Sequence, residues 1–155
     1  MKYDSTQDTQ EHIDKVAAYL EIVGGILYER GQNHDASKLQ EPEKEYFDKY
    51  TPRLAELTFG TPEYTQNIQD LKPALEHHYK NNSHHPQYYE NGITGMNLFD
   101  IIEMFFDWKA SGERGKKGTG NIYKSIDINA ERFGISKQLK QILTNTAKYM
   151  GYEQL

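Results

Sequence analysis

The spacing of apolar residues along the chain predicts an all-α protein. Few stretches alternate apolar and polar residues, whereas several long stretches repeat apolar positions every three to four residues. The first helix is predicted from about Thr9 to Arg30. Its apolar stripe consists of Ile13, Val16, Leu20, Val23 and Leu27. We interpret the Gly24-Gly25 pair as the place where another helix crosses closely.

Further helices are predicted by the same spacing. One begins near Pro42, and another begins at a Thr61 cap followed by Pro62. A helix from about Leu98 to Ala110 is apolar over most of its circumference and is predicted to be buried, and Ser136 caps a last helix. We therefore expect a single domain, residues 1–155, folded as a compact bundle of about five to seven helices.

Composition excludes several classes of site. The 155 residues include no cysteine, so disulfides, zinc–thiolate sites and a thiol nucleophile are ruled out. The net charge of -5 argues against a stable complex with duplex nucleic acid. No apolar run approaches a membrane span of about 20 residues, and the N-terminus lacks a signal-peptide core. We expect a cytoplasmic protein with no membrane partner.

Twelve tyrosines and six phenylalanines are many for this length. They pack a core or offer a surface on which a base stacks, and their helical spacing favours the core.

Candidate metal chemistry starts at His34-Asp35, where an imidazole and a carboxylate adjoin. A sharp backbone turn between them would let both hold one cation, and we expect Asp35 to cap a short helix. That helix carries Lys38, where its ammonium would meet an anionic substrate.

Other histidines and acids fall where a metal site would need them. The candidate ligands are His12, His34, Asp35, His78, His84, His85 and Asp107, and the choice between His84 and His85 is left open. His78 lies on the apolar stripe of its helix, whereas His77 is rotated about 100° away. A set rich in histidine and free of thiols favours one or two ions of Mn, Fe, Co, Ni or Zn, with Asp35 as a shared ligand.

Three acids share one narrow arc of the helix from Leu98 to Ala110: Asp100, Glu103 and Asp107. An unpaired buried carboxylate is costly, so we expect this arc to face water, a positive partner or a metal. We interpret Glu103 as a residue that orients a water or a ligand histidine rather than as a ligand.

The segment from Ser111 to Asn121 is rich in glycine and carries Arg114, Lys116 and Lys117. It is either a mobile surface loop or a flap that closes on a phosphate. Its glycine spacing does not match a P-loop.

With these residues the chain resembles the HD-domain superfamily of metal-dependent phosphohydrolases. His12, His34-Asp35 and Asp107 match the family pattern in order. The resemblance implies an HD-like helical bundle and a first metal held by these four residues. It also implies a second metal held by His78 with His84 or His85, and Lys38 beside the substrate phosphate.

A closer resemblance is to a family of uncharacterised bacterial and phage proteins, DUF5662. It is carried by residues 34–38 (HDASK), 78–86 (HYKNNSHHP) and 103–110 (EMFFDWKA). That family has no established activity, so the implied reaction comes only from the wider superfamily.

We therefore expect a phosphohydrolase that acts on a nucleotide or related small phosphate ester through a metal-activated water. The expected catalytic residues are Asp35, Lys38 and Glu103, and the expected substrate contacts are Lys38, Asn82, Trp108, Arg114 and Lys117. Two alternatives are an HD-type di-iron oxygenase and a non-catalytic phage protein that binds a nucleotide or a partner. The expected compartment is the cytoplasm of a bacterium or of a phage-infected host, and a homodimer is one of the oligomeric states left open.

Overall fold

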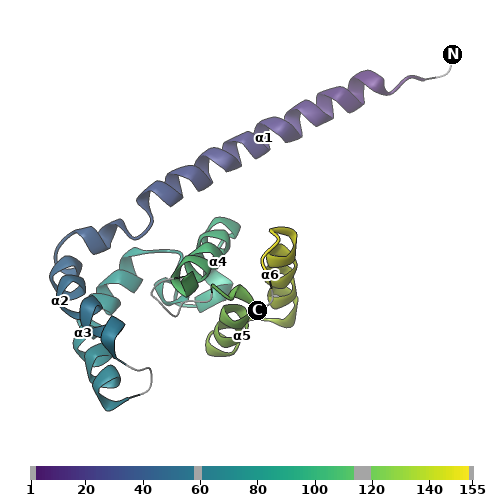
Figure 1. Ribbon diagram of the computed structural model, residues 1–155. Coiled ribbons are helices and arrows are strands. Elements are labelled where there is room, and N and C mark those ends of the chain that lie inside the picture. The colour runs from purple at the N-terminus through teal and green to yellow at the C-terminus, as the bar shows by residue number, and fades with distance from the viewer. Residues whose placement is uncertain (1–2, 58–60, 114–119, 154–155) are drawn as a thin grey trace. The chain divides into compact units, whose positions relative to one another are not determined.

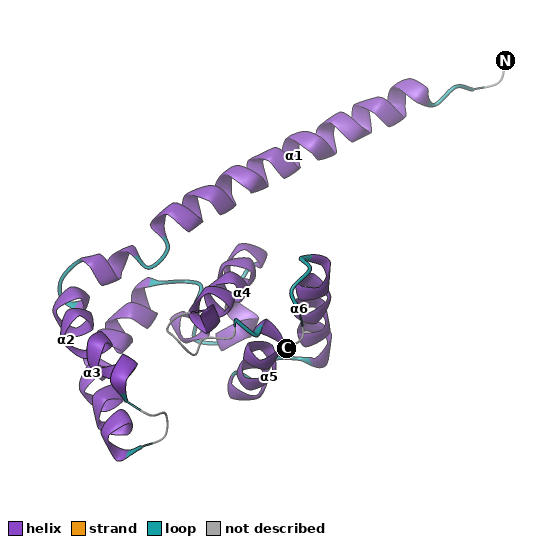
Figure 2. Ribbon diagram, in the orientation of Figure 1, coloured by secondary structure: helices purple, strands orange, loops and turns teal. Residues whose placement is uncertain are grey.

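The computed structural model describes residues 3–57, 61–113 and 120–153. Across these ranges the regular structure consists of six α-helices and three short 3₁₀ helices, with no strand (Figure 2). The all-α prediction is thus confirmed. The chain divides into two units, Met1–His34 and Asp35–Leu155. The expectation of a single domain remains a prediction.

The first unit is one helix, α1 (Thr6–Asn33). Asp4 starts it, since its Oδ1 accepts hydrogen bonds from the Thr6 backbone nitrogen at 3.0 Å and from the Thr6 hydroxyl at 2.7 Å. Each end lies three residues beyond the predicted one, because the terminal turns are polar and add nothing to the apolar stripe. The described residues of this unit contain no second helix, so the crossing predicted at Gly24-Gly25 has no partner within it.

In the second unit, α2 (Glu43–Glu56) and α3 (Pro62–Asn81) lie side by side (Figure 1). The predicted start of α3 is confirmed, because the Thr61 hydroxyl accepts a hydrogen bond from the Tyr64 backbone nitrogen at 3.2 Å. The two helices share a hydrophobic cluster. It consists of buried Tyr50, Leu71 and Ala74, with Tyr46, Phe47, Leu54 and Leu75 packed around them.

Three further helices, α4 (Leu98–Glu113), α5 (Ile122–Arg132) and α6 (Lys137–Tyr149), share a second cluster. Its buried members are Phe105, Ile122, Ile126, Leu143 and Ala147. The prediction that α4 is buried nearly all round is wrong, because Leu98 is 77 % exposed and Phe106 is 39 % exposed. The helix buries one face and leaves much of the other uncovered.

Helix α5 was not predicted, because its apolar positions are few and the preceding segment is rich in glycine. Asn121 starts it, since its side chain accepts a hydrogen bond from the Lys124 backbone nitrogen at 3.1 Å. The predicted Ser136 cap of α6 is confirmed by a 3.2 Å hydrogen bond from the Leu139 backbone nitrogen.

Three 3₁₀ helices lie in the connections of the second unit: η1 (Ala36–Leu39), η2 (Pro86–Tyr88) and η3 (Gly92–Gly95). The first precedes α2, and the other two lie between α3 and α4. Helix η1 contacts α2 and α3, and η2 contacts α3 and η3. Among the residues that the structure describes, no helix combines the length and apolarity that crossing a membrane requires.

Candidate metal centre

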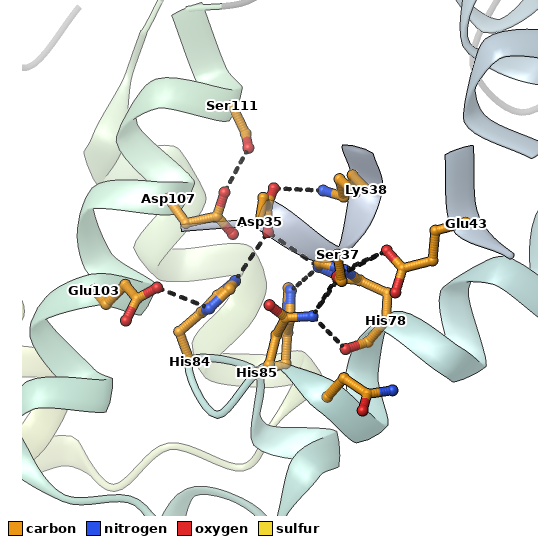
Figure 3. Close-up of polar contacts among 12 residues, drawn as sticks. Asp35, Ser37, Lys38, Glu43, His78, His84, His85, Glu103, Asp107 and Ser111 are labelled. Atoms are coloured by element: carbon orange, nitrogen blue, oxygen red, sulfur yellow. Dashed lines mark hydrogen bonds and ion pairs between the residues drawn. The ribbon is translucent and has the colours of Figure 1, made fainter. Parts of the chain in front are cut away.

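Four side chains of the second unit converge on one point (Figure 3). They are Asp35, His78, His84 and His85, and one donor atom of each lies within 4.8 Å of the others. Oδ1 of Asp35 lies 3.1 Å from Nε2 of His78 and 3.4 Å from Nε2 of His84. Nε2 of His78 lies 2.9 Å from Nε2 of His85. Asp35, which precedes η1, and the turn that follows α3 therefore meet beside the C-terminal end of α3.

These separations fit a shared metal ion. Donors at about 2.0–2.1 Å around a tetrahedral ion lie about 3.4 Å from one another, and neighbouring donors of an octahedron lie about 2.9 Å apart. The three measured separations of 2.9, 3.1 and 3.4 Å fall in that range. Three imidazoles and a carboxylate are donors that suit a divalent transition metal better than Ca²⁺ or Mg²⁺.

The backbone at Asp35 makes the sharp turn that the sequence analysis required. Its φ angle is +56°, a left-handed conformation that aspartate tolerates better than most residues. Asp35 occupies the N-cap position of η1, but its side chain makes no capping hydrogen bond, so that expectation is wrong. Instead Oδ2 pairs with the Lys38 ammonium at 2.6 Å, and Oδ1 faces the histidines.

The histidines come from the end of α3 and the turn after it. His78 is 1 % exposed, because it continues the buried face of Leu71 and Ala74. The helix ends at Asn81, and the His85 backbone nitrogen then donates to the Asn82 carbonyl at 3.1 Å. This turn brings His84, itself 2 % exposed, back toward Asp35.

A carboxylate lies on the outer nitrogen of two of these histidines. Nδ1 of His78 lies 2.9 Å from Oε2 of Glu43, and Nδ1 of His84 lies 3.0 Å from Oε1 of Glu103. Histidines that bind metals through one ring nitrogen commonly donate the other N–H to a carboxylate, which fixes the tautomer and the ring orientation. Such a contact was predicted from the sequence for Glu103.

Glu43 was not predicted. It is 0 % exposed and also pairs with Nδ1 of His77 at 2.8 Å. A glutamate in the first turn of a helix is favoured there by the helix dipole, so its position alone indicates no functional role. The signal was the apolar stripe of α2, because Phe47, Tyr50 and Leu54 continue backward by one helical turn onto Glu43.

The electrostatics of the cluster favour a neutral His85 beside an ionised Asp35. Burial raises the pKa of Asp35, but contacts with the ring nitrogens of His78 and His84 and with the Lys38 ammonium outweigh it and hold that pKa well below its ordinary value. Burial, followed by repulsion from His84 and His78, lowers the pKa of His85 to about 3. At neutral pH both side chains are therefore in the form that binds a cation.

The chain was compared with protein families, with curated proteins and with solved structures. The model of a family of unknown function, DUF5662, matches residues 1–149. The chain belongs to the DUF5662 family. No curated protein and no solved structure matches it. Membership assigns no activity, so what this DUF5662 protein does has to be argued from its own site.

The three acids on one face of α4 in this DUF5662 protein, Asp100, Glu103 and Asp107, have different surroundings. An oxygen of Asp107 lies within 4.8 Å of a ring nitrogen of His84, and the Ser111 hydroxyl donates to Asp107 Oδ1 at 3.2 Å. Glu103 meets His84. Asp100 does not face water. It is 0 % exposed and its carboxylate accepts hydrogen bonds from neutral donors.

The remaining predicted residues fall into three groups. His12 and His34 belong to the first unit, so their roles as ligands remain predictions. Arg114, Lys116 and Lys117 lie outside the described residues. Of the expected substrate contacts, Trp108 packs against the hydrophobic cluster of α4, α5 and α6, and packing accounts for its position. Asn82 lies beside the candidate metal centre, where its amide donates to the Ser37 hydroxyl at 2.9 Å.

Proposed function

We propose that this DUF5662 protein is a metal-dependent phosphohydrolase that acts on a small phosphate ester, with nucleotides as the first substrates to test. The observation that carries the proposal is the convergence of Asp35 Oδ1 with the ring nitrogens of three histidines. Buried histidines and a carboxylate in this arrangement are better suited to binding a cation than to stabilising the fold. Apolar residues would fill the same space at a lower desolvation cost.

Asp35, His78, His84 and His85 are the residues that would hold a divalent ion. When bound, such an ion polarises a phosphoryl oxygen and lowers the pKa of a water, which supplies a nucleophile near neutral pH. Glu103 accepts the outer N–H of His84 and keeps that ring directed at the donor set.

Lys38 supports an anionic substrate. Its ammonium lies 2.6 Å from Asp35 Oδ2, on the side of the carboxylate away from the histidines, and the side chain is 28 % exposed. A cation held beside a metal site and still open to solvent can pair with an incoming phosphate oxygen and stabilise the charge that develops on it. The reaction type itself follows the resemblance to the HD-domain superfamily.

The test is a panel of phosphate esters with a panel of metals. The full chain is stripped with a chelator, reloaded with Mn, Fe, Co, Ni or Zn, and incubated with aryl phosphates, aryl phosphodiesters and nucleoside mono-, di- and triphosphates. We expect release of phosphate or nucleoside with at least one metal. Turnover should stop in Asp35→Asn and persist in Asp48→Asn, an exposed aspartate on α2.

Absence of turnover with every metal and ester would contradict the proposal. Iron retention with consumption of dioxygen would instead indicate the oxygenase alternative. A nucleotide recovered unchanged from a tight complex would indicate a binding protein.

A further inference from the structure

Glu43 lies behind the candidate metal centre and joins three side chains to one carboxylate. Oε1 lies 2.8 Å from Nδ1 of His77, and Oε2 lies 2.9 Å from Nδ1 of His78 and 3.0 Å from the Ser37 hydroxyl. Its side chain is 0 % exposed, so these contacts replace water as its hydrogen-bond partners.

The position of one proton decides whether His78 can bind a cation. A neutral imidazole carries a proton on one nitrogen and a lone pair on the other. If the proton of His78 sits on Nε2, the ring donates to Asp35 Oδ1 at 3.1 Å and presents no lone pair to the centre. If it sits on Nδ1, the Nε2 lone pair faces Asp35 and His85.

Counting hydrogens around Nδ1 resolves the choice. The Asn82 amide has two hydrogens, which the His78 carbonyl at 2.8 Å and the Ser37 hydroxyl oxygen at 2.9 Å accept. The Ser37 hydroxyl has one hydrogen, which goes to Glu43 Oε2. The Asn82 amide nitrogen and the Ser37 hydroxyl also lie 3.0 and 3.1 Å from Nδ1, but their hydrogens already have these oxygen acceptors. An ionised carboxylate carries no hydrogen, so the 2.9 Å contact between Nδ1 and Glu43 Oε2 is a hydrogen bond only when the ring supplies the proton.

We propose that Glu43 is a positioning residue that keeps the ring proton of His78 on Nδ1 and thereby turns the Nε2 lone pair toward Asp35 and the metal. The inference rests on the proposed function for the identity of the ligand, but the location of the proton is independent of turnover. The same carboxylate reaches Ser37, two residues after Asp35, so one side chain sets the orientation of His78 and braces the turn that carries Asp35.

The substitution Glu43→Gln is a sharp probe because it exchanges one carboxylate oxygen for a donor of the same size. A glutamine N–H beside Nδ1 favours the opposite tautomer of His78. Glu45→Gln is the matched control, since Glu45 lies two residues along α2 and is exposed.

The experiment is ¹⁵N NMR of the histidine rings in the metal-free full chain at mildly alkaline pH, where ordinary imidazole is neutral. In the wild type we expect the His78 proton on Nδ1. In Glu43→Gln we expect it to move toward Nε2, with metal affinity reduced about 10- to 100-fold in a competition titration. Both quantities should stay at the wild-type value in Glu45→Gln.

The inference would be overturned if His78 of the wild type carried its proton on Nε2 and none on Nδ1. This measurement uses the wild-type protein alone, so it does not depend on whether a variant folds. An unchanged tautomer and affinity in Glu43→Gln would overturn it as well. The expected tautomer in a protein that hydrolyses no ester would leave the inference standing while the proposed function falls.

Discussion

The Ser83 hydroxyl donates to Asp100 Oδ1 at 2.7 Å, one residue before the candidate ligand His84. His84 itself meets Glu103, one turn further along α4. Two acids on successive turns of α4 therefore hold the segment that carries the histidines. Asp100 also accepts from the Tyr89 hydroxyl at 2.6 Å and from the Asn97 backbone nitrogen at 3.0 Å, so it ties both ends of the connection between α3 and α4.

Replacement of Tyr89 by phenylalanine should destabilise the protein. It removes one of the donors to a carboxylate that is 0 % exposed, and such a loss costs about 1–3 kcal/mol. The free energy of unfolding from urea titration is the measurement. Tyr88→Phe is the control, because that neighbouring ring is 46 % exposed. Equal stabilities of the two variants would show that the hydrogen bond to Asp100 contributes nothing.

The same hydrogen bond should be visible in alkaline titration. Burial, followed by the hydrogen bond to Asp100, raises the pKa of Tyr89 from 10.0 to about 12. A raised pKa means that the folded state holds the phenol proton more tightly. The stabilisation is therefore complete below about pH 10 and is lost as the pH rises through about 12. Subtracting the tyrosinate absorbance of Tyr89→Phe from that of the wild type should isolate one group that titrates near 12. A difference curve centred at 10 would contradict this.

Substitution of Glu103 by glutamine should weaken metal binding without unfolding the protein. The carboxylate pairs with Nδ1 of His84 at 3.0 Å, and loss of such an outer partner costs about 10- to 100-fold in metal affinity. Affinity is measured by competition with a chromogenic chelator. Glu113→Gln, on the same helix but exposed, should bind as the wild type does. If both variants bind equally well, Glu103 has no part in orienting His84.

Truncation of Phe105 tests the hydrophobic cluster that supports α4. The ring is 2 % exposed and packs with residues of α5 and α6, so Phe105→Ala should cost about 3–5 kcal/mol of the free energy of unfolding. Leu98→Ala on the same helix serves as the comparison, because Leu98 is 77 % exposed. A similar loss in the two variants would mean that the cluster is not what stabilises these helices.

The sequence predicted features that depend on local periodicity and caps. The stripe through Leu71, Leu75 and His78 placed His78 in the interior, and Thr61 and Ser136 marked two helix starts, because each of these signals lies within one or two helical turns. The DUF5662 family was also identified from motifs within short segments, and the comparison with known families confirms that membership.

Features that depend on tertiary contacts were missed. Glu43 and Asp100 resemble ordinary acids in the first turns of helices, and only the approach of His78 or Ser83 makes each of them a buried partner. Helix α5 contributes Ile122 and Ile126 to a cluster completed by residues of other helices, so its own pattern was weak. Four of the predicted ligands, Asp35, His78, His84 and His85, are brought together in the second unit. Their metal, like the roles of His12 and His34, remains a prediction.

X-ray absorption spectroscopy on the full chain, stripped and reloaded with one equivalent of zinc or manganese, tests the central claim most directly. We predict one ion per chain with nitrogen and oxygen neighbours, which lie at about 2.0–2.1 Å when the ion is zinc. The spectrum should also show the scattering pattern of several imidazoles, and the Asp35→Asn variant should lose this bound ion. Failure to retain stoichiometric metal, or a shell of oxygen alone that Asp35→Asn leaves unchanged, would contradict a centre built from Asp35 and the three histidines.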